Sequence, residues 1–268
     1  MGVKSAQGLD VSNYQGKYNW AGTTGLSFGI HRLTQGLGNG VKSPDPDAQW
    51  NSDQIKAKGL LRGAYHFFDP SLSGPAQAEY FVTQYSLIGL GDGDMLWLDN
   101  ETAGSSPAKV SAGALAFMTE LDKLRPNNPR GVYTFLSFAT EGNCAGLGKW
   151  PLWIAHPGGS APAAPQPWAK WAFWQWGTTQ GTDADAFNGT AAQLHAWVAT
   201  YATGAPKAYT APAHTSIRTL AHQHAQSVQG VIWLTARNSP QGFSSAESAY
   251  ITVGNWDASM PAGMTVWA

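Results

Sequence analysis

The sequence predicts an α/β fold, an irregular TIM-like β/α barrel followed by a small C-terminal α+β module. Over the first 200 residues, apolar strand-like runs alternate with helical patterns, which is typical of parallel βα units. Eight such runs occur, enough to close a barrel, and the last three are not separated by room for long helices. We therefore expect about five βα units followed by three strands.

The first half of the barrel is predicted from four apolar runs and three helical patterns. Strands are expected at 8–14, 28–36, 60–68 and 94–101. Helices are expected at 45–59, 73–86 and 107–125. One stripe of the last helix carries Val110, Leu115, Met118 and Leu121. The sequence "RPNNP" closes this helix, because proline cannot continue it.

The second half has shorter connections. Strands are expected at 131–135, 151–157, 171–177 and 183–189. A short helical segment is expected at 137–147, and a helix at 190–201. The connection "GGSAPAAPQP" is too rich in proline to form a helix. These strands are therefore expected to pair with little helical cover.

A change of composition marks the end of the barrel. After Tyr201 the stretch "ATGAPKAYTAPAHT" is rich in Pro and Ala and is typical of a semi-extended linker. The sequence thus predicts a barrel at 1–202, a linker at 203–214 and a second module at 215–268. Within that module, "SIRTLAHQHAQ" indicates a helix, and "GVIWLTARN" and "MPAGMTVWA" are apolar stretches that can form strands.

Composition excludes several classes of partner. Sixteen Lys and Arg against seventeen Asp and Glu give a net charge of -1, so no basic field favours nucleic acid or anionic lipid. No apolar run is long enough to span a bilayer, and the N-terminal residues show no secretory h-region, so we expect no membrane insertion and no signal peptide. The single cysteine, Cys144, is expected to be a structural core residue. Thirteen Trp and nine Tyr offer aromatic faces that suit sugar rings.

Two acids stand at the end of the fourth strand, in "LWLDNET". Catalytic groups of parallel barrels lie at the carboxyl ends of strands, where Asp99 and Glu101 fall. Because strand side chains alternate between faces, the two acids share a face, about 7 Å apart along the chain. Glycoside hydrolysis uses such a pair, one acid to protonate the leaving oxygen and one anion at the anomeric centre. An isolated D-x-E more often caps a loop or helix.

Several motifs in a fixed order give this pair a context. "GLDVSNYQG", "GAYHFF", "WLDNE", "VYT", "LWIA", "WQW" and "TDADAFNG" follow one another between residues 8 and 190. Together they resemble the strand motifs of the bacterial and phage muramidases of glycoside hydrolase family 25, the Chalaropsis-type lysozymes. The resemblance covers about two thirds of the chain and implies a catalytic barrel at 1–202.

Site residues follow from that resemblance. It implies an acidic ring of Asp10, Asp99, Glu101 and Asp183, with Glu101 as the general acid, Asp99 as an ionised partner, and Asp10 and Asp183 as substrate-binding groups. Other substrate contacts are expected at Tyr65, His66, Tyr133, Trp174 and Gln175. For His66, a structural role is an equal alternative. Whether Asp99 forms a covalent intermediate or orients the 2-acetamido group of the substrate stays open, since both routes retain configuration.

The resemblance implies a bacterial peptidoglycan hydrolase that cleaves β-1,4 bonds between N-acetylmuramic acid and N-acetylglucosamine. We expect no cofactor, no metal and a monomer. The absence of a signal peptide favours a phage endolysin, held in the host cytoplasm until its release to the wall. Residues 215–268 resemble the LysM peptidoglycan-binding module in "TLA", "LTARN" and "PAGMTVWA", although its opening Gly-Asp element is missing and a long segment interrupts it.

Two other functions fit parts of the sequence. A non-catalytic peptidoglycan-binding protein could use the same barrel, but the presence of all four acids disfavours it. A zinc amidase could use His222 and His224 in "AHQHAQ". On a helix, however, residues two apart do not face each other, and the H-E-x-x-H and Cys-pair patterns are missing.

Overall fold

A computed structural model gives the structure of residues 5–38, 43–158, 160 and 163–201, and of four short strands between residues 208 and 267. The chain divides into two compact units, Met1–Thr203 and Gly204–Ala268. Each unit is described by itself below. None of the helices in the described parts of the chain is long and apolar enough to cross a membrane.

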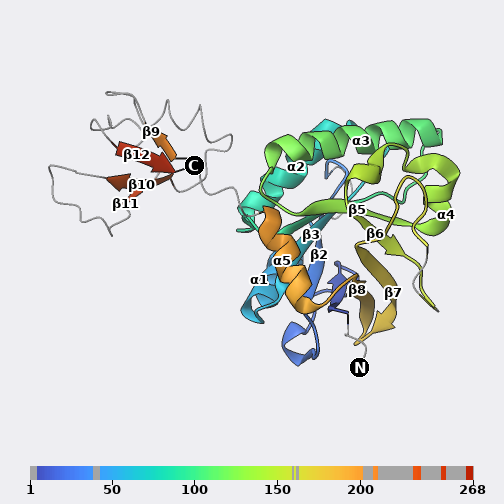
Figure 1. Cartoon of the computed structure of the whole chain (residues 1–268), viewed down its shortest axis with the longest axis horizontal. Helices are drawn as coiled ribbons and strands as arrows, with labels where there is room; N and C mark the ends of the chain where they lie inside the picture. The colour runs from blue at the N-terminus through green and yellow to red at the C-terminus, as the bar shows by residue number, and fades with distance from the viewer. Residues whose placement is uncertain are drawn as a thin grey trace. The chain divides into compact units, whose positions relative to one another are not determined.

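The first unit is a closed barrel of eight strands in sequence order, as predicted (Figure 1). The strands are β1 Gln7–Val11, β2 Phe28–Gln35, β3 Leu61–Phe67, β4 Met95–Asp99, β5 Arg130–Phe135, β6 Leu152–Ala155, β7 Phe173–Thr179 and β8 Thr182–Phe187. Neighbours from β1 to β7 pair in parallel. Their carboxyl ends therefore meet at one rim of the barrel.

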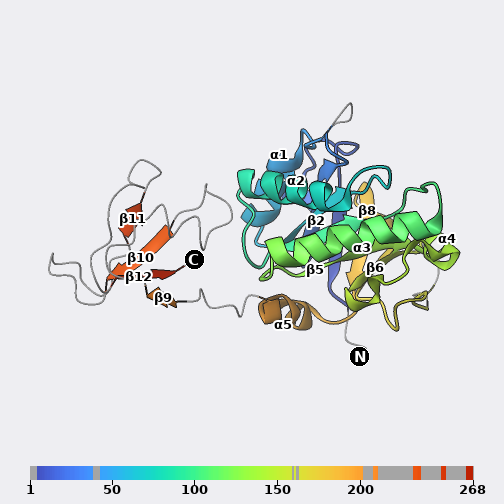
Figure 2. The same cartoon turned by 90° about the horizontal axis from the view of Figure 1, so that it is seen from above.

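Helices cover the outside of the barrel unevenly. The longer ones are α1 Ala48–Ala57, α2 Gly74–Leu87, α3 Pro107–Leu124 and α5 Ala191–Tyr201. Only short turns follow β1 and β5, namely η1 Trp20–Gly22, α4 Leu136–Phe138, η2 Ala139–Asn143 and η3 Leu147–Lys149. In both views α2 and α3 lie side by side (Figure 2). The fold class is thus confirmed, with helical cover concentrated after β2, β3 and β4.

Local signals explain where α2 and α3 begin. Ser73 and Ser106 stand immediately before these helices, and their side chains accept hydrogen bonds from the amides of Ala76 and Lys109. Such caps satisfy amides that have no partner inside the helix. Each helix also has a proline in its first turn, where no amide hydrogen is needed.

The eighth strand departs from the all-parallel arrangement that the alternation of elements predicts. Only Gln180 and Gly181 separate β7 from β8, and two residues can form a hairpin but cannot carry a parallel crossover. Accordingly β8 pairs antiparallel with both β7 and β1. The start of β8 therefore lies at the rim where the other strands end.

The barrel interior is polar at the rim where β1 to β7 end and apolar in the part farther from that rim, here called the lower part. Alternate residues of β2, β4, β6 and β7 fill the lower part in one cluster, which includes Phe28, Ile30, Met95, Trp97, Trp153 and Phe173. At the next inward positions, Arg32 and Asp99 follow Ile30 and Trp97. Gly131 leaves room for the Trp97 ring, which a Cβ at this position would overlap. The packed layer thus forms a floor beneath polar groups.

The second unit contains a four-stranded sheet among its described residues. The strands β9 Ala208–Thr210, β10 Ile232–Ala236, β11 Ala249–Ile251 and β12 Met264–Trp267 lie in the order β11-β10-β12-β9. All three pairings are antiparallel. Strand β9 falls within the range 203–214 that the sequence predicts as a linker. The helix expected at "SIRTLAHQHAQ" and the histidines His222 and His224 lie outside the described residues.

Candidate active site

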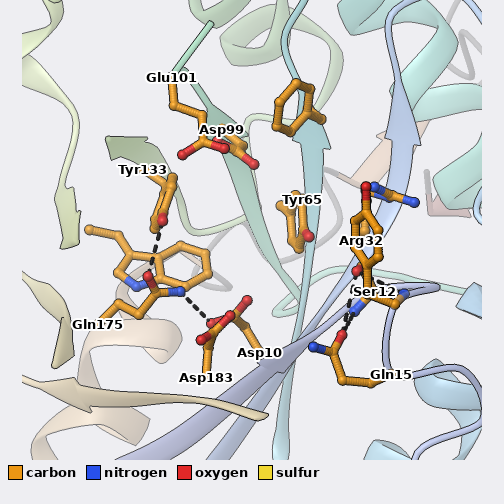
Figure 3. Close-up of a pocket in the computed structure, with 13 residues that line it drawn as sticks. Asp10, Ser12, Gln15, Arg32, Tyr65, Asp99, Glu101, Tyr133, Gln175 and Asp183 are labelled. Carbon is orange, nitrogen blue, oxygen red and sulfur yellow. Dashed lines mark hydrogen bonds between the residues drawn. The ribbon is translucent and has the colours of Figure 1, made fainter. Parts of the chain in front are cut away.

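A cavity of about 180 Å³ opens at the carboxyl-end rim of the barrel (Figure 3). Its lining combines four acids with aromatic, amide, hydroxyl and guanidinium groups. The lining residues are Asp10, Ser12, Tyr14, Gln15, Arg32, Tyr65, Phe67, Asp99, Glu101, Tyr133, Trp153, Gln175 and Asp183. The four acids predicted as a ring are therefore brought to one cavity.

Strand geometry explains why these acids meet. Asp99 ends β4 and Asp10 lies near the end of β1, so parallel pairing brings both to the same rim. Asp183 comes from the start of β8, and the antiparallel register sets it directly opposite Asp10. Figure 3 shows Asp10 and Asp183 together at one side of the cavity, with Asp99 and Glu101 at the other.

Asp99 is a buried acid with an incomplete set of partners. Its side chain is 6% exposed, and its Oδ1 atom has no hydrogen-bond partner among the described residues. Burial raises the pKa of Asp99 well above its usual value, and the charges of Glu101 and Asp10 raise it further. The Arg32 guanidinium acts in the opposite direction. A buried carboxyl oxygen without a partner is suited to a ligand that brings a hydrogen-bond donor.

Glu101 is the less buried member of the pair. It lies two residues beyond Asp99, and Figure 3 shows both side chains directed into the cavity. Partial burial raises the pKa of Glu101, and the charge of Asp183 adds to this effect. The intervening Asn100 is fully buried and donates to the backbone oxygen of Asn143 at 3.2 Å. Because side chains along the chain alternate in direction here, Asn100 points away from the cavity and anchors the segment, while Asp99 and Glu101 point into the cavity.

The pKa shifts bear on the expected charge states of Asp99 and Glu101. The sequence predicts an ionised Asp99 beside a protonated Glu101. Burial raises the pKa of both carboxyls; the charge of Glu101 adds to the shift at Asp99, and the charge of Asp183 adds to that at Glu101. Two like charges in one desolvated cavity disfavour double ionisation. The pair is therefore suited to hold a single proton to a higher pH than a solvated carboxyl would.

A chain of hydrogen bonds orients Asp10. The Tyr133 hydroxyl donates to Gln175 Oε1 at 3.0 Å, and Gln175 Nε2 donates to Asp10 Oδ2 at 2.8 Å. Burial, followed by the charge of Asp183, raises the pKa of Asp10 to about 7. Burial also raises the pKa values of Tyr65 and Tyr133 well above their usual value, so both remain phenols. Tyr65, Tyr133 and Gln175 thus lie where the sequence predicts substrate contacts.

His66 does not reach the cavity, which corrects its place among the expected substrate contacts. Its neighbour Tyr65 points inward, so alternation turns His66 outward. His66 Nε2 donates to Gln77 Oε1 at 3.1 Å, and Nδ1 accepts from Thr34 Oγ1 at 2.8 Å. Its ring stacks on Phe117 at 5.0 Å between centroids, and burial lowers its pKa to about 4. His66 is a neutral histidine of the barrel's outer packing.

Trp174 is corrected for the same reason. Gln175 faces the cavity, so its neighbour Trp174 turns away and is not among the lining residues. Trp174 Nε1 donates to the backbone oxygen of His156 at 2.9 Å, and the ring lies 6.1 Å from that of Trp171. The indole of the cavity is that of Trp153, on β6.

Other cavity residues carry weaker sequence signals. Tyr14 is 86% exposed at the rim, and the Arg32 guanidinium lies 5.7 Å from its ring centroid. Arg32 Nε donates to Asp45 at 3.0 Å in a buried ion pair. Asp185, on β8 below Asp183, is fully buried beside Asp10. The alternation in "TDADAF" places both β8 acids on one face and could have indicated Asp185.

Cys144 is a core residue, as expected. Its side chain is fully buried, with the thiol near Thr134 and Asn100, and burial raises its pKa to about 11.

The described residues contain no cluster of three or more His, Cys, Asp or Glu side chains suited to a metal ion.

Comparisons with known proteins agree with this geometry. Residues 9–186 match the family model described as glycosyl hydrolases family 25. The chain is 30% identical to Lysozyme M1 of Streptomyces globisporus over 212 residues, which cover 72% of this chain and 71% of the relative. It is 31% identical to an N,O-diacetylmuramidase of Chalaropsis over 202 residues, or 69% and 92% of the two chains. The crystal structure of a bacterial lysozyme from Streptomyces coelicolor matches with a TM-score of 0.63 and 30% identity, covering 75% of this chain and 100% of that protein.

Proposed function

Because the chain belongs to glycosyl hydrolase family 25, we propose that its barrel hydrolyses the β-1,4 bonds between N-acetylmuramic acid and N-acetylglucosamine in bacterial peptidoglycan. The activities named for its relatives, a lysozyme and an N,O-diacetylmuramidase, support this substrate. The observation that carries the proposal is the pair of Asp99 and Glu101 in one cavity, both with raised pKa values.

Glu101 is the general acid in this proposal. It is the more exposed of the two acids, and its raised pKa keeps a proton available to a higher pH than a solvated carboxyl would. Transfer of that proton to the glycosidic oxygen converts the departing sugar into a neutral alcohol. After the sugar leaves, the Glu101 carboxylate can take a proton from the attacking water.

Asp99 stabilises positive charge at the anomeric centre. When the single proton of the pair is on Glu101, the buried Asp99 carboxylate either attacks the anomeric carbon or orients the 2-acetamido group for that attack. The free Oδ1 atom is suited to accept the acetamido N–H. Both routes invert the anomeric carbon twice, first when the leaving sugar is displaced and again when water displaces the group bound in the intermediate, and therefore retain configuration.

The remaining cavity groups hold the glycan. Tyr65, Tyr133 and the exposed ring of Tyr14 offer faces for sugar rings, while Asp183 is suited to accept hydroxyl hydrogens. Asp10 lies opposite Asp183 and is fixed by Gln175, so the two acids can bind one sugar residue from one side of the cavity.

Product chemistry tests the proposal directly. Purified peptidoglycan is digested with the full-length chain, the new reducing ends are reduced with borohydride, and the reduced sugars are identified. A muramidase yields muramitol. Glucosaminitol would instead identify a glucosaminidase, and the absence of new reducing ends would leave a non-catalytic wall-binding barrel or an amidase.

The C-terminal unit is proposed to bind the cell wall. Its likeness to LysM elements and its separation from the barrel as a compact unit support a targeting role. We expect a monomeric enzyme that acts as a phage endolysin, released from the host cytoplasm to the wall. A binding assay with the isolated unit and sedimented walls tests the targeting role.

A further inference from the structure

The packed floor beneath the four cavity acids contains a fifth acid, Asp185. Its side chain is fully buried on β8, one inward position below Asp183. The register pairs Asp185 with Gly8, two residues before Asp10 on β1. Asp185 therefore lies one inward position deeper in the barrel than the Asp10–Asp183 pair, and the Phe28 ring fills the space next to Gly8.

The partners of Asp185 define its chemical state. Trp153 Nε1 donates to Asp185 Oδ1 at 2.8 Å, and the Asp185 carboxyl lies close enough to that of Asp10 to share a hydrogen bond with it. Asp185 Oδ2 is buried and has no hydrogen-bond partner among the described residues. Two ionised carboxylates are acceptors only, so a hydrogen bond between them requires one proton.

The surroundings decide which acid holds that proton. Asp10 accepts a hydrogen bond from Gln175 Nε2, which favours the charged form of Asp10. Asp185 is more deeply buried, and its charged form would face the charges of Asp10 and Asp183. These surroundings favour the proton on Asp185, from which a hydrogen bond would run to Asp10.

We propose that Asp185 is a positioning residue that acts in its protonated form, donating to Asp10 from below so that the Asp10 carboxylate stays directed into the cavity. Trp153 fixes the Asp185 carboxyl, and Gln175 holds Asp10 from the side. Asp10 is then set by two donors before substrate arrives, which is the preorganisation that binding sites need. The inference rests on the proposed substrate-binding role of Asp10.

Two substitutions separate this role from a packing role. Asp185→Asn keeps an acceptor for Trp153 and gains an N–H donor toward Asp10, but cannot ionise. Asp185→Leu has similar size and no donor. We expect kcat/KM on peptidoglycan within about threefold of wild type for the amide and a loss of about tenfold or more for leucine, because a hydrogen bond to a charged group is removed.

The pH dependence of stability provides a measurement independent of activity. Burial raises the pKa of Asp185, so its stabilising contribution is complete below the carboxyl's unfolded value and is lost as pH rises through the folded value. The other titratable groups near this carboxyl, Asp10, Asp183 and Tyr133, are present in both variants. The thermal midpoint of Asp185→Asn should therefore rise relative to that of wild type as the pH increases from 5 to 8.

The outcomes distinguish the inference from the proposed function. An amide variant as inactive as the leucine variant, or a folded leucine variant as active as wild type, would overturn the positioning role. A midpoint difference that does not change with pH would show that Asp185 is ionised in the folded protein. If leucine prevents folding, the amide variant decides alone. If wild type hydrolyses no peptidoglycan, the proposed function fails, and the stability measurement still decides the state of Asp185.

Discussion

At the scale of single residues, Glu101 is the group on which the chemistry depends most. Glu101→Gln preserves shape but cannot deliver a proton, and positioned acid catalysis contributes about 10²- to 10⁴-fold. We expect wall lysis to fall by that factor while the thermal midpoint stays near that of wild type. Glu79→Gln is a matched control, since Glu79 is exposed on α2 and outside the cavity. Lysis by Glu101→Gln within about threefold of wild type would assign the proton to another group.

Asp99 and Asp183 differ in burial and should differ in effect. Asp99→Asn removes the anion nearest the proposed anomeric centre, so turnover should fall about 10²-fold or more. Asp183→Asn leaves that anion in place and should mainly raise KM. Initial rates on soluble glycan fragments, measured over a range of concentrations, separate the two effects. Equal and small losses at both positions would indicate residues that cap loops.

Tyr14 tests whether the rim of the cavity binds sugar. Its ring is 86% exposed, although it lines the cavity, and an aromatic face held at such a rim is suited to stack on a glycan. Tyr14→Ala should raise KM several-fold, because stacking is worth about 1 kcal/mol, with little change in kcat. Trp50→Ala provides the control, since Trp50 is an exposed aromatic residue outside the cavity. Similar KM changes in both variants would argue against a rim subsite.

At the scale of elements, the β7–β8 hairpin controls the site. The turn has Gln180 at a φ of 53° and Gly181 at 83°, so both residues are left-handed, as tight hairpins require. Reversal of the chain there brings Asp183 opposite Asp10. The catalytic rim thus depends on a two-residue turn as well as on the parallel strands.

A substitution in this turn should therefore cost stability. Gly181→Ala places a side chain in the left-handed region, at a cost of about 1–2 kcal/mol, and should lower the thermal midpoint of the barrel by several degrees. Gly91→Ala is the control, because Gly91 has no positive φ and a Cβ there would meet open space. An unchanged midpoint in Gly181→Ala would show that the turn adapts without strain.

At the scale of the whole molecule, the two compact units predict separable activities. A fragment ending near Ala205 keeps every strand of the barrel and every cavity residue, so it should fold and cleave small soluble glycans as the full chain does. Loss of a wall-binding unit removes the local concentration effect, which can be worth about 10²-fold, so lysis of intact walls should slow.

Sedimentation with purified walls checks this separation, with the isolated C-terminal unit fused to a fluorescent carrier as the converse test. A fragment that is insoluble would show that the C-terminal unit stabilises the barrel. A fused carrier that stays in the supernatant would show that the C-terminal unit does not bind walls.

Much of this protein was determined by local sequence signals. Apolar runs predicted the eight strands, and spaced apolar positions with chain-breaking residues predicted the helices, because both depend on neighbours close in the chain. The order of short motifs predicted the barrel and the family. The four acids were predicted from their place in those motifs, and the structure brings all four to one cavity.

Tertiary structure decided which neighbours face inward and which strand reverses. Alternation shows that only one of Tyr65 and His66, or of Trp174 and Gln175, can reach the cavity, but the choice depends on barrel register. The antiparallel β8 sets Asp183 opposite Asp10 and buries Asp185 beneath it. Asp10 lies more than 170 positions before Asp183 and Asp185 in the chain. The raised pKa values of these acids come from burial, which only the closed barrel creates.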